Sequence, residues 1–256
     1  MPEFSSQGIA IAYQVQGEGR PILLIHGFAS SAEVNWVATG WVDTLVKAGY
    51  QAIALDNRGH GRSRKLYDPQ LYFAREMAND ARRLLDHLGI ARLPVIGYSM
   101  GARIAAYLAL DHPERVEALV LGGMGLNLVT GLADSEPIIA ALTAETLSEV
   151  THPTGRQFRI FAEHTGADRA ALAACMINSR QPMAEADVRR IAVPALVAVG
   201  EEDTMAGDPA ALAALLPQAE AFVIPRRDHM RATGDKAFKS AALEFLARQT
   251  APTAPE

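Results

Sequence analysis

A serine stands at the centre of the pentapeptide GYSMG, with Gly97 and Gly101 two positions away from Ser99 on either side. The apolar run before it, residues 93–96, is typical of a buried strand, and the apolar residues after it recur at helical spacing. On a tight turn from strand to helix a serine hydroxyl projects from the carboxyl edge of a sheet, and small flanking residues let strand and helix approach closely. The pattern predicts that Ser99 is a nucleophile.

Serine is a weak nucleophile near neutral pH, so it needs a general base that a third group orients. In chains with this turn the acid follows a later strand and the histidine comes last. Asp203 follows the apolar run at residues 195–199, and His229 follows the last such run. Both residues should emerge at the same sheet edge as Ser99. We therefore expect Ser99, Asp203 and His229 to meet as nucleophile, acid and base.

Other acidic residues compete for the role of the orienting acid. Glu201 and Glu202 lie in the same turn as the predicted acid, and the alternative for them is a solvated turn. Asp228 adjoins His229 along the chain, so its side chain is expected to point elsewhere and to be structural. Residues 122–125 follow the preceding strand and contain no carboxylate, which removes the other source of the acid.

The helix that starts after the serine should attract negative charge. The first backbone N–H groups of a helix lack partners within it, and the helix dipole adds positive charge there. The N–H of Met100, directly after the serine, is therefore the expected donor to an anion that forms on a substrate oxygen.

The elements that must position these residues form an α/β succession. Helices are predicted at residues 75–88, 104–110, 209–216 and 236–246. Strands are predicted at residues 9–15, 21–25, 51–55, 93–96, 116–121, 193–199 and 221–224. Strands this apolar are covered on both faces, so we expect a mostly parallel central sheet flanked by helices.

The alternation stops after residue 121. Residues 122–192 contain several predicted helices and no convincing buried strand, so they are interpreted as a helical insertion. The α/β core domain would then comprise residues 1–121 and 193–248. The tail, residues 249–256, is expected to be disordered.

Within the insertion, Thr154 and Asp168 are the expected N-caps of two helices. The single cysteine, Cys175, also lies there and is expected to be a small buried side chain, since it has no partner for an intramolecular disulfide. The apolar residues that should pack on the core or line a pocket are Phe158, Phe161, Leu172, Met176 and Ile177.

With these motifs in order, the chain resembles an α/β-hydrolase fold serine hydrolase of the esterase or lactonase type, and the likeness covers almost its whole length. The motifs that carry it are HGF at residues 26–28, DNRGHGRS at residues 56–63, the serine turn, and the pair Asp203 and His229. The resemblance implies that the Phe28 N–H is a second oxyanion-hole donor beside Met100. It also implies that the insertion is a cap over the active site.

The same resemblance assigns supporting roles to other residues of these motifs. His26 and His60 are expected to support loops, and Arg58 and Arg62 to be structural although they could bind an acidic substrate. Relatives of this kind carry a glycine just before the histidine, where this chain has Arg227 and Asp228, which puts a positive charge near the pocket. A serine in place of a nucleophilic aspartate argues against haloalkane dehalogenases and epoxide hydrolases.

Composition narrows the partners. The net charge is −5, from 24 Lys and Arg against 29 Asp and Glu, so there is no global positive field for nucleic acid. The chain shows no apolar run long enough for a membrane helix, no Cys and His cluster at zinc spacing and no signal peptide. We therefore expect a cytoplasmic enzyme that uses no metal or other cofactor and acts on a small molecule.

The expected function is hydrolysis of a small carboxylic ester, lactone or related acyl compound through an acyl-enzyme. A C–C bond hydrolase, a thioesterase or a perhydrolase would use the same residues, and the sequence does not separate them. A ligand-binding receptor on the same fold is the alternative of a different class. Acyl length and oligomeric state are not predicted.

Overall fold

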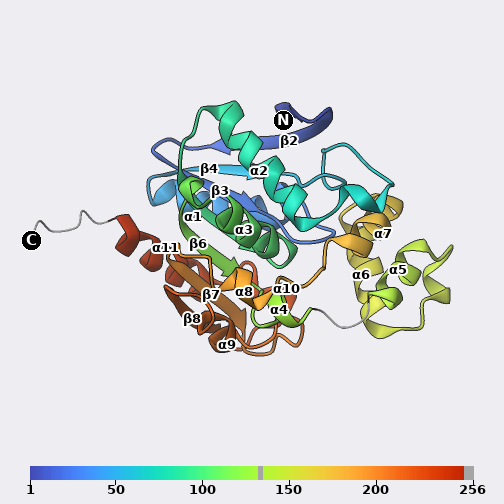
Figure 1. The fold of residues 1–256 in the computed structure, drawn as a ribbon. Helices are drawn as coiled ribbons and strands as arrows, with labels where there is room; N and C mark the ends of the chain where they lie inside the picture. The colour runs from blue at the N-terminus through green and yellow to red at the C-terminus, as the bar shows by residue number, and fades with distance from the viewer. Residues whose placement is uncertain (132–134, 251–256) are drawn as a thin grey trace, which may run out of the picture.

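One sheet organises the part of the chain that the computed structural model describes, residues 1–131 and 135–250 (Figure 1). Its eight strands follow the order β1-β2-β4-β3-β5-β6-β7-β8. The strands are β1 (Glu3–Ser6), β2 (Ile9–Gln16), β3 (Arg20–Ile25), β4 (Tyr50–Leu55), β5 (Leu93–Tyr98), β6 (Val116–Gly122), β7 (Ala195–Gly200) and β8 (Ala219–Ile224). β1 and β2 pair antiparallel, as do β2 and β4, and the pairs from β4 to β8 are parallel. The predicted α/β class and mostly parallel sheet are confirmed.

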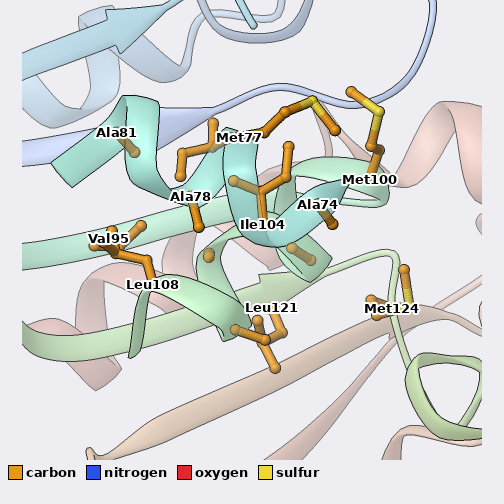
Figure 2. Close-up of a cluster of buried hydrophobic side chains, with 14 of the residues drawn as sticks. Ala74, Met77, Ala78, Ala81, Val95, Met100, Ile104, Leu108, Leu121 and Met124 are labelled. Atoms are coloured by element: carbon orange, nitrogen blue, oxygen red, sulfur yellow. The ribbon is translucent and has the colours of Figure 1, made fainter. Parts of the chain in front are cut away.

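Helices cover both faces of the sheet because its strands are apolar on both sides. The longer core helices are α1 (Trp41–Lys47), α2 (Ala74–Leu88), α3 (Met100–Asp111) and α11 (Lys236–Thr250). Along β3, Leu23 and Ile25 point into a cluster that includes α2 and α3, and Ile22 and Leu24 point into one with α1 and α11. Figure 2 shows part of the first cluster, where Met77 and other residues of the helices gather beside the strands. The carboxyl end of the parallel strands is thereby held between two helical layers.

The remaining helices are short or belong to residues 122–192. They are α4 (Asn127–Thr130), α5 (Glu136–Thr143), α6 (Pro153–His164), α7 (Arg169–Asn178), α8 (Glu185–Val188), α9 (Pro209–Ala213) and α10 (His229–Ala232). α5, α6 and α7 form a group beside the main body, whereas α4 and α8 lie close to the sheet (Figure 1). In the described portion no helix is long and apolar enough to cross a membrane.

Both ends of the α5 to α7 group are held by one side chain of the core. Arg103 on α3 is buried, and its guanidinium donates hydrogen bonds to the carbonyls of Asn127, Leu128 and Gln181 at 2.7 to 3.0 Å. The N–H of Met183 also donates to the Leu128 carbonyl at 2.9 Å. The chain therefore leaves and re-enters the core at nearly the same place.

Several predicted boundaries are wrong in detail. α9 ends at Ala213, three residues before the predicted end, and α11 continues to Thr250, so the first two residues of the expected tail are helical. Residues 251–256 of that tail lie outside the described residues. Asp168 caps α7 as predicted, but Thr154 caps nothing. Pro153 at the first turn of α6 places the N-cap at His152 instead.

Candidate active site

The turn around the serine has the tight geometry that its glycines predict. Ser99 has φ 54° and ψ −114°, a conformation that side chains rarely adopt, and it joins the end of β5 to the start of α3. A Cβ atom on Gly97 would lie 2.3 Å from the Gly101 carbonyl oxygen, and one on Gly101 would lie 1.9 Å from that of Ile25. The close approach of strand and helix therefore requires glycine at both positions.

The structure brings Ser99, His229 and Asp203 together in a chain of two hydrogen bonds, which is called the relay below. The serine Oγ lies 3.0 Å from His229 Nε2, and His229 Nδ1 lies 2.7 Å from Asp203 Oδ2. A carboxylate can only accept, so Nδ1 carries the proton and Nε2 is left to accept from the serine hydroxyl. The sequence placed these residues at strand ends, and the parallel sheet brings those ends to one edge.

The acid of this relay is held rigidly. The Asp203 side chain is fully buried, and its Oδ1 accepts the N–H groups of Met205 at 2.8 Å and Ala206 at 3.0 Å. The start of residues 122–192 braces this loop, since the Gly125 N–H donates to the Ala206 carbonyl and the Asn127 amide to that of Met205. These bracing contacts join segments far apart in sequence, and no local pattern predicts them.

The acidic residues next to Asp203 and His229 along the chain do not hydrogen-bond to the His229 ring in the described structure. Glu201 accepts the Arg226 N–H at 2.8 Å, and Glu202 is exposed. Asp228 accepts the N–H groups of Met230 and Arg231, which caps α10 directly beside the relay histidine. The Asp228 contacts match the structural role that the sequence indicated for it, and the exposure of Glu201 and Glu202 fits the solvated turn that was their alternative.

The arginine that precedes the relay histidine by two positions is itself neutralised. Arg227 forms an ion pair with Asp235 at 2.6 Å. Its charge is therefore balanced beside the pocket.

Two backbone N–H groups at the site have no acceptor among the described residues. Within residues 1–131 and 135–250, neither the Phe28 nor the Met100 N–H donates a hydrogen bond. The loop that carries Phe28 is constrained, because Gly27 N–H donates to Asn35 Oδ1 at 2.8 Å and Ala29 has φ 58°. The insertion adds a tie, since the Thr165 hydroxyl lies 3.0 Å from the Ala29 carbonyl oxygen.

A cavity of about 250 Å³ opens beside the serine. Its wall combines the relay residues Ser99 and His229 with aromatic side chains and small polar ones. The lining residues are Gly27, Phe28, Ser30, Val34, Asn35, Thr39, Tyr98, Ser99, Phe158, Phe161, His229, Met230 and Thr233. Phe158 and Phe161 come from α6, so the insertion contributes to the wall, which is one of the two roles that its apolar residues suggested.

Two other histidines near the site are built into the loops and are not free to act as bases. His26 is fully buried, with Nδ1 2.7 Å from the Gly27 carbonyl and Nε2 accepting the Asn57 N–H. Burial lowers the pKa of His26 to about 4. Burial and the neighbouring His26 lower the pKa of His60 to about 3.

The arginines of the second motif also serve structure or stay at the surface. Arg58 is buried and forms a two-pronged ion pair with Asp80 at 2.7 Å, so it is not available to a substrate. Arg62 is exposed, and its N–H donates to Asp56. Cys175 is buried, and burial raises the pKa of its thiol to about 12. In the described chain no group of three or more His, Cys, Asp or Glu is placed to hold a metal ion.

Comparison with known proteins adds to this geometry. A family model for the alpha/beta hydrolase fold matches residues 20–151. "Putative carbamate hydrolase RutD" of Variovorax paradoxus (strain S110) is 29% identical over 95% of this chain and 98% of its own. "Soluble epoxide hydrolase" of Corynebacterium sp. (strain C12) is 36% identical over 53% of this chain and 45% of its own. A solved hydrolase from Pseudomonas aeruginosa PA01 superposes with a TM-score of 0.79 at 25% identity, covering 96% of this chain and 97% of that one.

Proposed function

Because the chain belongs to the alpha/beta hydrolase fold family and is a hydrolase, we propose that it is a cofactor-independent serine hydrolase acting on a small carboxylic ester, lactone or related acyl compound. The observation that carries the proposal is the relay from Ser99 through His229 to Asp203, at 3.0 and 2.7 Å. It supplies a nucleophile, a base and an orienting acid in one place.

The proposed reaction begins when Ser99 Oγ attacks the substrate carbonyl while His229 takes its proton. Asp203 stabilises the imidazolium that forms. The unpaired N–H groups of Phe28 and Met100 receive the negative charge on the tetrahedral oxygen, which is where preorganised donors contribute most. The acyl-enzyme forms when His229 returns its proton to the leaving group, and water activated by His229 then releases the acid.

The relatives suggest which types of bond this chain could hydrolyse, but they do not identify its substrate. Epoxide hydrolases are among them, but an enzyme of that kind would need an aspartate where this chain has Ser99. A carbamate is an acyl compound that the same relay could attack. C–C bond hydrolysis, thioester hydrolysis and perhydrolysis also share the relay and are separated by substrate tests. We further propose that residues 122–192 act as the cap and that the enzyme is cytoplasmic.

The test is hydrolysis of p-nitrophenyl acetate, butyrate and octanoate by the purified protein. We expect Ser99→Ala and His229→Ala to lower kcat by about 10⁴- to 10⁶-fold, because each variant removes a group that acts in every bond-making step. Asp203→Asn should lower it by about 10⁴-fold, because the wrong imidazole tautomer would face the serine. Chain-length preference would report the size of the cavity.

The matched control is Asp228→Asn, which changes a carboxylate one residue from His229 but keeps a good N-cap on α10. Its kcat should stay within about 3-fold of wild type. Activity retained by Ser99→Ala would overturn the serine mechanism. Tight binding of a ligand with no turnover, and no labelling of Ser99 by a fluorophosphonate, would favour the receptor alternative.

A further inference from the structure

Arg180 places a positive charge beside two aromatic residues of the cavity wall. Its guanidinium carbon lies 5.8 Å from the centre of the Phe28 ring and 5.3 Å from that of Phe158. Both rings line the cavity beside Ser99. A ring face attracts a cation without using its N–H donors as hydrogen bonds to an oxygen, so those donors can still bind a planar anion.

Arg180 has no partner of its own where other buried arginines do. Arg58 pairs with Asp80, and Arg103 and Arg159 donate to backbone carbonyls. Across the described ranges 1–131 and 135–250, Arg180 forms no ion pair with a carboxylate and donates no hydrogen bond. A partly buried cation without a partner is costly, so it is expected to be completed by a ligand.

The surroundings of Arg180 disfavour its positive charge. Burial, followed by the nearby positive charge of Arg103, lowers the pKa of Arg180 to about 10, so that it is still charged at neutral pH. Arg103 already donates three of its five side-chain N–H groups to backbone carbonyls, whereas Arg180 donates none to the described residues. A guanidinium binds a planar carboxylate through two parallel N–H···O bonds, and one arginine balances the single charge of that group.

Arg180 also lies beside Phe28, the residue that carries one of the two proposed oxyanion donors. Its guanidinium carbon lies 5.8 Å from the centre of the Phe28 ring, and its charge also acts on the buried thiol of Cys175 in the insertion. A carboxylate held by Arg180 would therefore belong to the part of the substrate close to the scissile carbonyl.

We propose that Arg180 binds a carboxylate of the substrate, so that this hydrolase prefers acyl substrates that carry a carboxylate a short distance from the scissile carbonyl. The inference rests on the serine mechanism proposed above. In this reaction Arg180 takes no part in bond making, and it selects and orients the substrate.

The test compares three length-matched pairs of ethyl esters by ethanol release. The monoethyl esters of succinate, glutarate and adipate carry the carboxylate, and ethyl butyrate, pentanoate and hexanoate are their neutral counterparts. We expect kcat/KM for at least one monoester to exceed that of its counterpart by about 10- to 100-fold, the effect of one bidentate charged hydrogen-bond pair. Arg180→Gln should bring that ratio to within about 3-fold of one, and Arg180→Lys should give an intermediate ratio.

Arg231→Gln is the matched control, because Arg231 is an exposed arginine two residues from His229 and should leave the ratio as in wild type. Equal activity on both members of every pair would overturn the inference and leave the serine mechanism standing. So would an Arg180→Gln enzyme that loses both esters equally, which is the result of a merely structural role. If Arg180→Gln does not fold, an unchanged ratio in Arg180→Lys decides against the proposal. Failure of the wild type on all six esters would count against the serine mechanism itself.

Discussion

At the scale of single residues, the site depends on the absence of a side chain at Gly101 as well as on the hydroxyl of Ser99. The backbone of α3 passes so close to β3 that a methyl group at Gly101 would overlap the Ile25 carbonyl and come within 2.7 Å of that of His26. The next residues along that loop are Gly27 and then Phe28, which carries one of the proposed oxyanion donors. A side chain at position 101 would therefore disturb both the packing of the start of α3 and the position of the loop that carries Phe28.

Gly101→Ala should consequently lower the free energy of unfolding by about 3 kcal/mol or more, since backbone must move to admit the methyl group. It should also lower kcat, because the movement displaces the loop toward Phe28. Urea unfolding and ester hydrolysis measure the two effects. Gly89→Ala is the control: Gly89 has φ 68° but open space around it, so only about 1 kcal/mol of conformational strain is expected. Equal losses in the two variants would contradict the clash.

Residue types at strand ends were sufficient to predict Ser99, Asp203 and His229 as neighbours, because a parallel sheet brings the carboxyl ends of its strands together. Arg180 and Thr165 were not predictable in this way. They reach the site from the insertion, and their positions depend on how that segment folds over the sheet. No spacing along the chain encodes that contact.

At the scale of elements, a polar contact joins the C-terminal end of α6 to the loop after β3. Thr165 follows the last turn of α6, and its hydroxyl lies 3.0 Å from the Ala29 carbonyl oxygen and 3.1 Å from that of Phe161 in its own helix. Ala29 has a positive φ that a non-glycine residue rarely adopts, so the loop benefits from an external tie. The insertion thus helps to hold the backbone next to Phe28.

Thr165→Val should lower kcat by about 3- to 10-fold with a smaller effect on KM, because about 1 kcal/mol of loop placement is lost. Steady-state kinetics on the best p-nitrophenyl ester would show the split. Thr165→Ser keeps the hydroxyl and should retain wild-type kcat. A Val variant that changes KM alone would indicate that Thr165 shapes the pocket rather than the oxyanion loop.

The elements that the sequence predicted are those with a clear apolar pattern. The central strands are strongly apolar and were all identified. β1 has only two buried residues of four, and α1 has seven residues with no cap signal from a side chain, so neither was predicted. Helix ends were wrong where a proline shifted the cap, as at Pro153, or where the last turns depend on tertiary contacts.

At the scale of the whole molecule, two neutral histidines link stability to pH. The pKa values of about 4 for His26 and about 3 for His60 lie below the ordinary value of 6.5. The unfolded chain therefore binds protons that the folded chain does not, once the pH falls below about 6.5. Stability contributed by these groups is complete above that pH and is lost as the pH falls.

The free energy of unfolding should accordingly fall between pH 7 and pH 5, with a slope that approaches about 1.4 kcal/mol per pH unit for each histidine. Urea unfolding at pH 7, 6 and 5 measures it, in a range above the ordinary pKa of carboxylates. His60→Gln removes one titrating group and should make the slope shallower. An unchanged slope in this variant would contradict a role for His60 in the pH dependence.

The contact between Arg103 and both ends of the α5 to α7 group has a consequence for how such an enzyme can diversify. The residues just before and just after α5 to α7 are held together independently of that group, because the Met183 N–H donates to the Leu128 carbonyl and Arg103 hydrogen-bonds to both sides. The strands on either side of the insertion, β6 and β7, are also neighbours in the sheet. Recombination could therefore replace the segment that contains α5 to α7 as a unit, while Ser99, His229 and Asp203 keep their places. New substrate ranges could then arise by exchange of one segment, provided that the new segment keeps a donor such as the Thr165 hydroxyl for the Ala29 carbonyl.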